Sequence, residues 1–151
     1  MGNNSHAEGN MCEAGNTGHA EGSGTKAATY RSDWIAHAEG LNTEAHGCAS
    51  HAEGIDTFAN GDGAHAGGIG TIAENNGQMA IGMYNDPTRD DDPKTSQLLF
   101  MIGNGASDTE RHNAVEVRRN GSMMVSNSII IGGIELTPEK LSALLELLDK
   151  Q

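Results

Sequence analysis

The chain has 151 residues, a formal net charge of −12 and only 24 Leu, Ile, Val and Phe residues. Leu, Ile, Val and Phe therefore fall below roughly one fifth of the chain, the level under which a conventional monomeric core is not expected. The acidity argues against nucleic acid and anionic membranes as partners, because both are bound through Lys and Arg. No apolar run is long enough to cross a membrane, and the N-terminal stretch lacks the blocks of a signal peptide.

A short phrase recurs from the start of the chain, first as Ser-His-Ala-Glu-Gly at residues 5–9. The histidines of successive copies are separated by 13, 18, 14 and 14 residues, which indicates a period of fourteen with one deletion and one insertion. Each histidine is followed by Cys or Thr six residues later and by Ala eight residues later. The repeated polar residues are His6, His19, His37, His51, His65, Glu8, Glu21, Glu39 and Glu53.

Glycine recurs too often in these repeats for a helix or a coiled coil. Short strands joined by Gly-containing turns fit the period, and such units stack into a β-solenoid. Because side chains alternate along a strand, we expect Ser5, Ala7 and Gly9 to face the interior and His6 and Glu8 to face outward. The apolar variant at residues 79–82 is expected to end the array.

Stacking would align the histidines in one column and the glutamates in a neighbouring column. Such columns could bind a transition metal, but repeated columns usually serve architecture, so we expect no metal and no cofactor. Acid–base catalysis is not expected either, because catalysis needs a unique constellation and here the same pair recurs. The sequence therefore predicts register-setting side chains in a protein that is not an enzyme.

An insertion between the second and third repeats contains Tyr30, Arg31, Asp33 and Trp34. Aromatic residues beside an arginine are typical of a loop that binds a glycan or a protein, which makes these four residues the candidate receptor-binding site. Alternatively, Trp34 covers an edge of the roll or fills an interface between chains.

Two further features have simple interpretations. Asp90, Asp91 and Asp92 lie between prolines and are expected to form a solvated connector, since their spacing does not match a calcium-binding loop. Cys12 and Cys48 occupy different positions of the repeat, so stacking would not pair them, and both are expected to be free thiols.

The last third of the chain is richer in apolar residues. It predicts strands at residues 98–102, 114–117, 123–125 and 129–131, with a hairpin turn at Asn120-Gly121. Thr137 is a suitable N-cap for a terminal helix, with Pro138 at the first helical position. The apolar stripe of this helix consists of Leu141, Leu144, Leu145 and Leu148, and a helix so short needs partners.

The repeats over about residues 5–83 resemble the YadA-like heads of trimeric autotransporter adhesins and the same repeats in bacteriophage tail-fibre proteins. That resemblance implies a left-handed β-roll with about fourteen residues per turn and three chains around a common axis. The stretch "LLFMIGNGASDTERHNAVEVRRNGSMMV" also resembles a segment of phage tail fibres. A short helix, instead of an autotransporter stalk and anchor, favours the fibre form.

These patterns together predict an all-β homotrimer. Its parts would be a roll at residues 1–84, an acidic linker at 85–96, a β-rich junction at 97–134 and a trimerising helix at 135–151. The expected function is a structural and adhesive fibre segment, in a virion tail or otherwise extracellular, that binds a host-surface glycan or protein and other tail subunits. The alternatives are a bacterial adhesin fragment and a polysaccharide-degrading tail enzyme, for which Arg111 and His112 would be further candidates.

Overall fold

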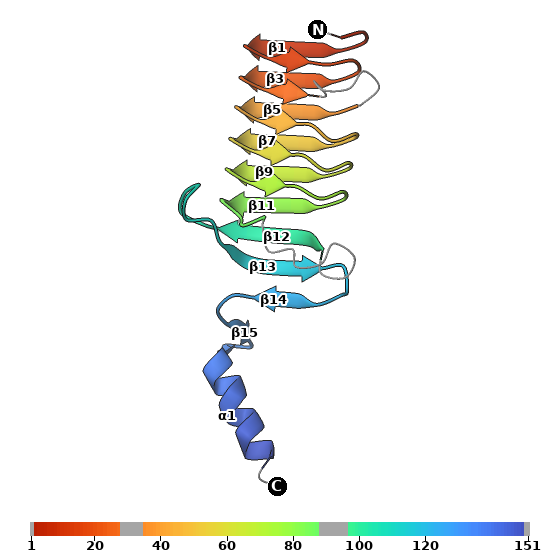
Figure 1. Ribbon diagram of the computed structural model, residues 1–151. Coiled ribbons are helices and arrows are strands. Elements are labelled where there is room, and N and C mark those ends of the chain that lie inside the picture. Colours follow the sequence, from red (N-terminus) through yellow and green to blue (C-terminus); the bar gives the residue numbers. More distant parts are fainter. Residues whose placement is uncertain (1, 28–34, 88–96, 150–151) are drawn as a thin grey trace.

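The computed structural model describes residues 2–27, 35–87 and 97–149. Along the repeats, a five-residue strand alternates with a two-residue strand, and successive turns stack into a β-solenoid of about five turns (Figure 1). The repeat histidine begins each long strand and the repeat alanine ends each short strand. The long strands are β1 (His6–Asn10), β3 (His19–Ser23), β5 (His37–Leu41), β7 (His51–Ile55) and β9 (His65–Ile69).

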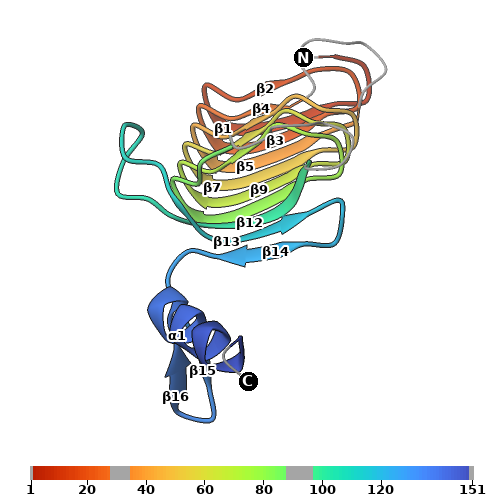
Figure 2. The same cartoon turned by 60° about the horizontal axis from the view of Figure 1, so that its bottom comes forward.

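Two parallel sheets result from this stacking. The short strands form their own sheet and run along the other side of each turn (Figure 2). Equivalent repeat positions pair in both sheets, so His37 pairs with His51 and His51 with His65. The short strands are β2 (Glu13–Ala14), β4 (Lys26–Ala27), β6 (Glu44–Ala45), β8 (Phe58–Ala59) and β10 (Ile72–Ala73).

The interior between the two sheets is built from small side chains. The repeat alanines of both sheets form one buried cluster, and the threonines that precede the short strands are fully buried beside them. These residues confirm that the small face of the repeat points inward. Because Ala and Thr fill little volume, the two sheets lie close together and every long strand contacts the short strand that follows it.

Glycine departs from the expected alternation. Gly22, Gly40 and Gly68 are exposed on the outer surface of the long-strand sheet, although the pattern placed them on the inner face with Ala. The φ of these residues lies between 115° and 121°. The alternation rule holds only for extended backbone, so the expectation for glycine was wrong.

The long-strand sheet continues beyond the histidine repeats. β11 (Met79–Met83) pairs with β9, and β12 (Leu98–Asn104) then pairs with β11 in parallel, Gly82 opposite Gly103. The sheet turns antiparallel at β13 (Asn113–Arg118) and β14 (Met123–Val125). The apolar variant of the repeat therefore does not end the sheet, because residues 100–104 add a further strand in register.

The short-strand sheet ends at β10, where a side chain replaces the next strand. The Asn85 Oδ1 atom accepts a hydrogen bond from the Ile72 N–H at 2.8 Å, and its Nδ2 donates to the Ile72 carbonyl at 2.9 Å. Asn113 pairs in the same way with the backbone of Asp86. Leu98 and Met101 are fully buried at this end of the interior.

The C-terminal segment lies beyond β14, at the opposite end from β1 (Figure 1). β15 (Ile129–Ile131) and β16 (Ile134–Leu136) form a separate hairpin, followed by α1 (Pro138–Leu148). The Thr137 side chain accepts a hydrogen bond from the Lys140 N–H, which confirms the expected N-cap and the proline at the helix start. β16 was not predicted, and its last two residues belong to the segment 135–151 that was expected to form the helix. Among the described residues, no helix has the length and apolar character needed to span a lipid bilayer.

Candidate functional site

The histidines form one column along the outer face of the long-strand sheet. Each begins a long strand, and adjacent ring centroids are 4.6–4.9 Å apart, close to the spacing of paired strands. The rings of His37 and His51 are stacked with an interplanar angle of 10°, whereas His51 and His65 meet edge to face. The histidine column predicted from the spacing is therefore present.

A column of glutamates runs beside the histidines, two residues further along each strand. The Nε2 atom of the histidine lies 3.3 Å from the Glu8 carboxylate in the first turn, 3.6 Å from Glu21 in the second and 3.7 Å from Glu39 in the third. In the last copy Gly67 replaces the glutamate, and His65 lies 3.4 Å from Glu53 of the preceding strand. The column thus ends with a contact between strands.

His51 lies between two of these carboxylates. One ligand atom each of Glu39, His51 and Glu53 lies within 4.8 Å of the other two, and no other group of three or more His, Cys, Asp or Glu in the described part of the chain is that compact. The strand pairing fixes this arrangement, because Glu39 is in register with Glu53 and His37 with His51.

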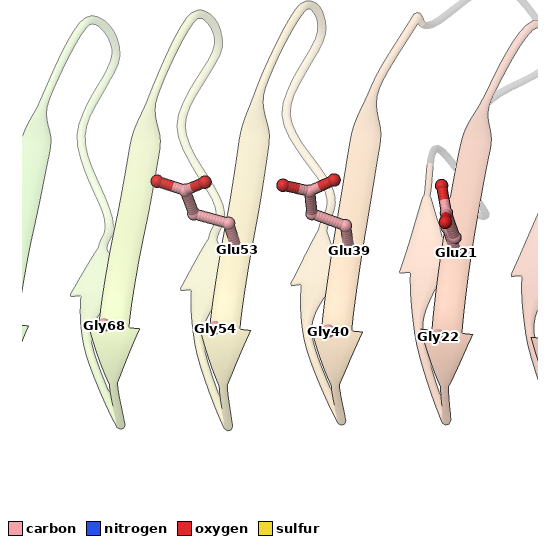
Figure 3. A pocket seen from close by; sticks show the side chains of 7 residues that line it. All are labelled: Glu21, Gly22, Glu39, Gly40, Glu53, Gly54 and Gly68. Atoms are coloured by element: carbon pink, nitrogen blue, oxygen red, sulfur yellow. The ribbon is translucent and has the colours of Figure 1, made fainter.

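The glutamates and the glycines that follow them line an open groove of about 480 Å³ (Figure 3). Figure 3 shows the Glu39 and Glu53 side chains side by side on adjacent strands, with Gly40 and Gly54 next along the same strands. The glycines are required by the backbone, because a Cβ at these positions would overlap the carbonyl oxygen of the next glycine along the column. The ionisable side chains that line the groove are therefore carboxylates, and the histidine column lies beside them.

The environment of His51 favours its neutral form. Partial burial lowers the pKa of His51, and the charges of His37 and His65 lower it further, against an opposing effect of Glu53 and Glu39. The Nε2 atom of His51 is buried without a hydrogen-bond partner, as are those of His19 and His37. Buried polar atoms are normally satisfied, so these imidazole nitrogens are notable.

A second charged cluster lies on the short strands and was not predicted. Lys26 donates to the Glu44 carboxylate at 2.9 Å, and the His46 Nε2 atom lies 2.8 Å from the same group. Burial acts to raise the pKa of Glu44, but the hydrogen bonds and charges of Lys26 and His46 outweigh it and lower that pKa. Lys26 and Glu44 occupy the same position of successive repeats, so the pair could have been predicted from the sequence.

The other candidate residues predicted from the sequence lie outside the described residues or at the junction. Tyr30, Arg31, Asp33 and Trp34, and also Asp90, Asp91 and Asp92, lie outside the described residues. Arg111 donates to the backbone carbonyls of Gly70 and Asn85, at 2.7 and 3.0 Å, and also pairs with Asp108. His112 contacts Asn104, with 2.6 Å between Nδ1 and Oδ1. Arg111 therefore joins the junction to the solenoid.

Cys12 and Cys48 form no disulfide and are free thiols, as expected.

The fold places the protein in the class of β-solenoids, with a column of imidazoles and a column of carboxylates on one face. Comparison with protein-family models, with curated proteins and with solved structures gave no match to the chain. Its function is therefore inferred from its own residues.

Proposed function

We propose that the chain is a structural and adhesive segment of a homotrimeric fibre. The observation that carries this proposal is the apolar surface of the C-terminal segment. Leu141, Leu144, Leu145, Leu147 and Leu148 are each 46–62% exposed, and α1 buries none of its residues. A helix of eleven residues is marginal alone, and burial of its leucines against copies of itself would stabilise it.

The hairpin before the helix has the same property. Ile129, Ile130, Ile131 and Ile134 are 47–69% exposed, so the apolar surface continues from β15 and β16 into α1. Monomeric proteins rarely expose such contiguous apolar patches. Three chains packed around a common axis would cover both elements at once.

The solenoid offers a further apolar surface for association. The last residues of the long strands stack as Leu41, Ile55, Ile69 and Met83, of which Leu41, Ile55 and Met83 are 41–45% exposed. In the proposed trimer, left-handed rolls with fourteen-residue turns pack through this surface. The elongated stack then acts as a rigid spacer.

The adhesive role would require a surface that recognises a receptor. We propose a glycan or protein of a host cell surface as the partner, with Tyr30, Arg31, Asp33 and Trp34 as the candidate contacts. Other fibre or tail subunits would continue the fibre, which places the protein in a virion tail or otherwise outside the cell. The bacterial adhesin and the polysaccharide-degrading enzyme stay as alternatives without an observation that favours them.

The proposal is tested by the mass of the protein in solution. Light scattering after size exclusion is expected to give three times the 15.8-kDa mass of the chain. Leu145→Glu should release monomers, because an unpaired charge in the leucine interface costs about 3 kcal/mol per chain. Ser142→Glu is the matched control, since it adds the same charge outside the leucine stripe and should leave the trimer intact. A folded wild-type monomer would contradict the proposal.

A further inference from the structure

We propose that Glu39, His51 and Glu53 form a binding site for a divalent transition-metal ion of the zinc type. The inference concerns residues of one chain and does not depend on the proposed trimer. It gives one member of the histidine column a role besides setting the register of the strands.

The donor set is the first reason. One imidazole nitrogen and two carboxylate oxygens lie within 4.8 Å of one another. Zinc and its neighbours in the first transition series bind imidazole and carboxylate ligands together, whereas Ca²⁺ and Mg²⁺ prefer oxygen ligands alone. The combination therefore favours a transition metal over the alkaline earth ions.

The unsatisfied nitrogen of His51 is an independent reason. Its Nε2 atom is buried without a hydrogen-bond partner, although two carboxylates are nearby. The Nε2 atoms of His19 and His37 also lack a hydrogen-bond partner, but each lies 3.6–3.7 Å from the glutamate of its own strand. His51 has no such ion pair with a described carboxylate. The Nε2 atom of His6, at the end of the column, is 3.3 Å from the Glu8 carboxylate, within hydrogen-bonding distance. A buried polar atom without a partner calls for an explanation such as a bound ion. A metal ion between the two carboxylates would satisfy the His51 nitrogen and neutralise charge in the groove.

The surroundings allow the ligands to close on an ion. Donor atoms of a tetrahedral zinc centre are roughly 3.4 Å apart, so the carboxylates must move inward by about 1 Å. The side chains of Glu39 and Glu53 are 43% and 45% exposed along the groove, which leaves them free to rotate while the strand register holds their backbones. The open side of the groove leaves a coordination position for water.

Each of the two carboxylates also lies close to a neighbouring histidine. The His37 Nε2 atom lies 3.7 Å from Glu39, and the His65 Nε2 atom lies 3.4 Å from Glu53. Neither contact is a hydrogen bond in this structure, but a hydrogen bond from either histidine would orient its carboxylate and increase affinity. Gly67 replaces the next glutamate, so His65 lacks a carboxylate on its far side and does not complete an equivalent site.

The experiment is a calorimetric titration of the full chain with Zn²⁺, together with the visible absorption of the Co²⁺ form. We expect saturable binding in the wild type and a tetrahedral Co²⁺ spectrum. His51→Ala should weaken Zn²⁺ binding by at least about a hundredfold, since loss of even an outer partner costs ten- to a hundredfold. His6→Ala is the matched control, because it removes the same residue from the same repeat position at the end of the column. It should leave the affinity unchanged.

Glu53→Gln provides a second variant in case His51→Ala does not fold, which circular dichroism would reveal. It keeps the size of the side chain, removes one charge and should weaken Zn²⁺ binding by about tenfold or more. The proposal is overturned if wild-type protein does not bind Zn²⁺, if His6→Ala weakens binding as much as His51→Ala, or if Ca²⁺ and Mg²⁺ compete equally with Zn²⁺. Light scattering on the same samples shows separately whether the chains associate.

Discussion

At the scale of single residues, the glycine column determines how closely the strands can stack. Gly54 has a φ of 108°, and a Cβ added there would lie 2.2 Å from the carbonyl oxygen of Gly68. Gly63, at a corner of the same turn, also has a positive φ, but nothing lies within 4 Å of its added Cβ. Comparing substitutions at Gly54 and Gly63 therefore separates the effect of a positive φ from that of the close approach of the neighbouring backbone.

Gly54→Ala is expected to destabilise the protein by about 3 kcal/mol or more, because it combines a strained conformation with a backbone overlap. Gly63→Ala should cost only about 1–2 kcal/mol, the price of a left-handed conformation alone. Chemical unfolding of both variants at one protein concentration measures the difference. Equal losses would show that the close approach is not important.

Sequence patterns predicted the columns at this scale but not their detailed contacts. The spacing of His and Glu was sufficient to place them on one outer face. It could not show that Glu53 would contact His65 across strands, because that contact depends on the missing side chain of Gly67 and on the rotamer of Glu53. The unsatisfied nitrogen of His51 likewise depends on local burial, which a repeated motif does not encode.

At the scale of the strands, buried threonines lie just before the short strands and differ in how their hydroxyl groups are satisfied. The Thr57 hydroxyl donates to the Glu53 carbonyl at 3.2 Å, and the Thr71 hydroxyl donates to the Gly67 carbonyl at 3.3 Å. The Thr43 hydroxyl is equally buried but has no hydrogen-bond partner. The same residue type in the same repeat position is therefore expected to contribute differently to stability.

Thr57→Val should lower the free energy of unfolding by about 1 kcal/mol, because it removes a buried hydrogen bond while keeping the shape of the side chain. Thr43→Val should leave stability unchanged or raise it, since it removes a buried hydroxyl that lacks a partner. Denaturant unfolding curves of the two variants provide the comparison. A loss in Thr43→Val as large as that in Thr57→Val would contradict this explanation.

Elements near the junction were predicted less completely than the repeats. The expected strands at residues 98–102 and 114–117 are present within β12 and β13, but their pairing was not foreseen. β12 joins the stack because Ile102-Gly103 is in register with Ile81-Gly82, a match separated by many residues from the regular repeats. The capping by Asn85 was also missed, since a side chain that imitates a strand leaves no periodic signal.

At the scale of the whole molecule, the stack has two different ends. The antiparallel strands β13 and β14 follow β12 at one end, whereas β1 is an edge strand at the other. Between these ends each turn contacts its neighbours in a similar way, so a turn can be removed if its boundaries are respected. Alanine also recurs every seven residues, which raises the question of which length is the structural unit.

Deletion of residues 51–64 should give a folded protein, because His37 would then pair with His65 and every column would stay in register. Deletion of residues 51–57 should prevent folding, since Phe58 and Ala59 of a short strand would occupy the place of a long strand. Circular dichroism and thermal melting distinguish the two proteins. If the shorter deletion folds as well as the longer one, the unit is seven residues and not fourteen.

The direction of the hydrogen bonds in the stack has a mechanical consequence. The strands lie across the long axis of the molecule, so their ladders run along it, with β1 and α1 at opposite ends (Figure 1). Tension applied between these ends would therefore act on the hydrogen bonds between one pair of strands at a time. It would not shear the hydrogen bonds of many strands together. A single chain under such a pull would yield turn by turn, and each turn that opens would lengthen the tether and absorb work before the next one breaks.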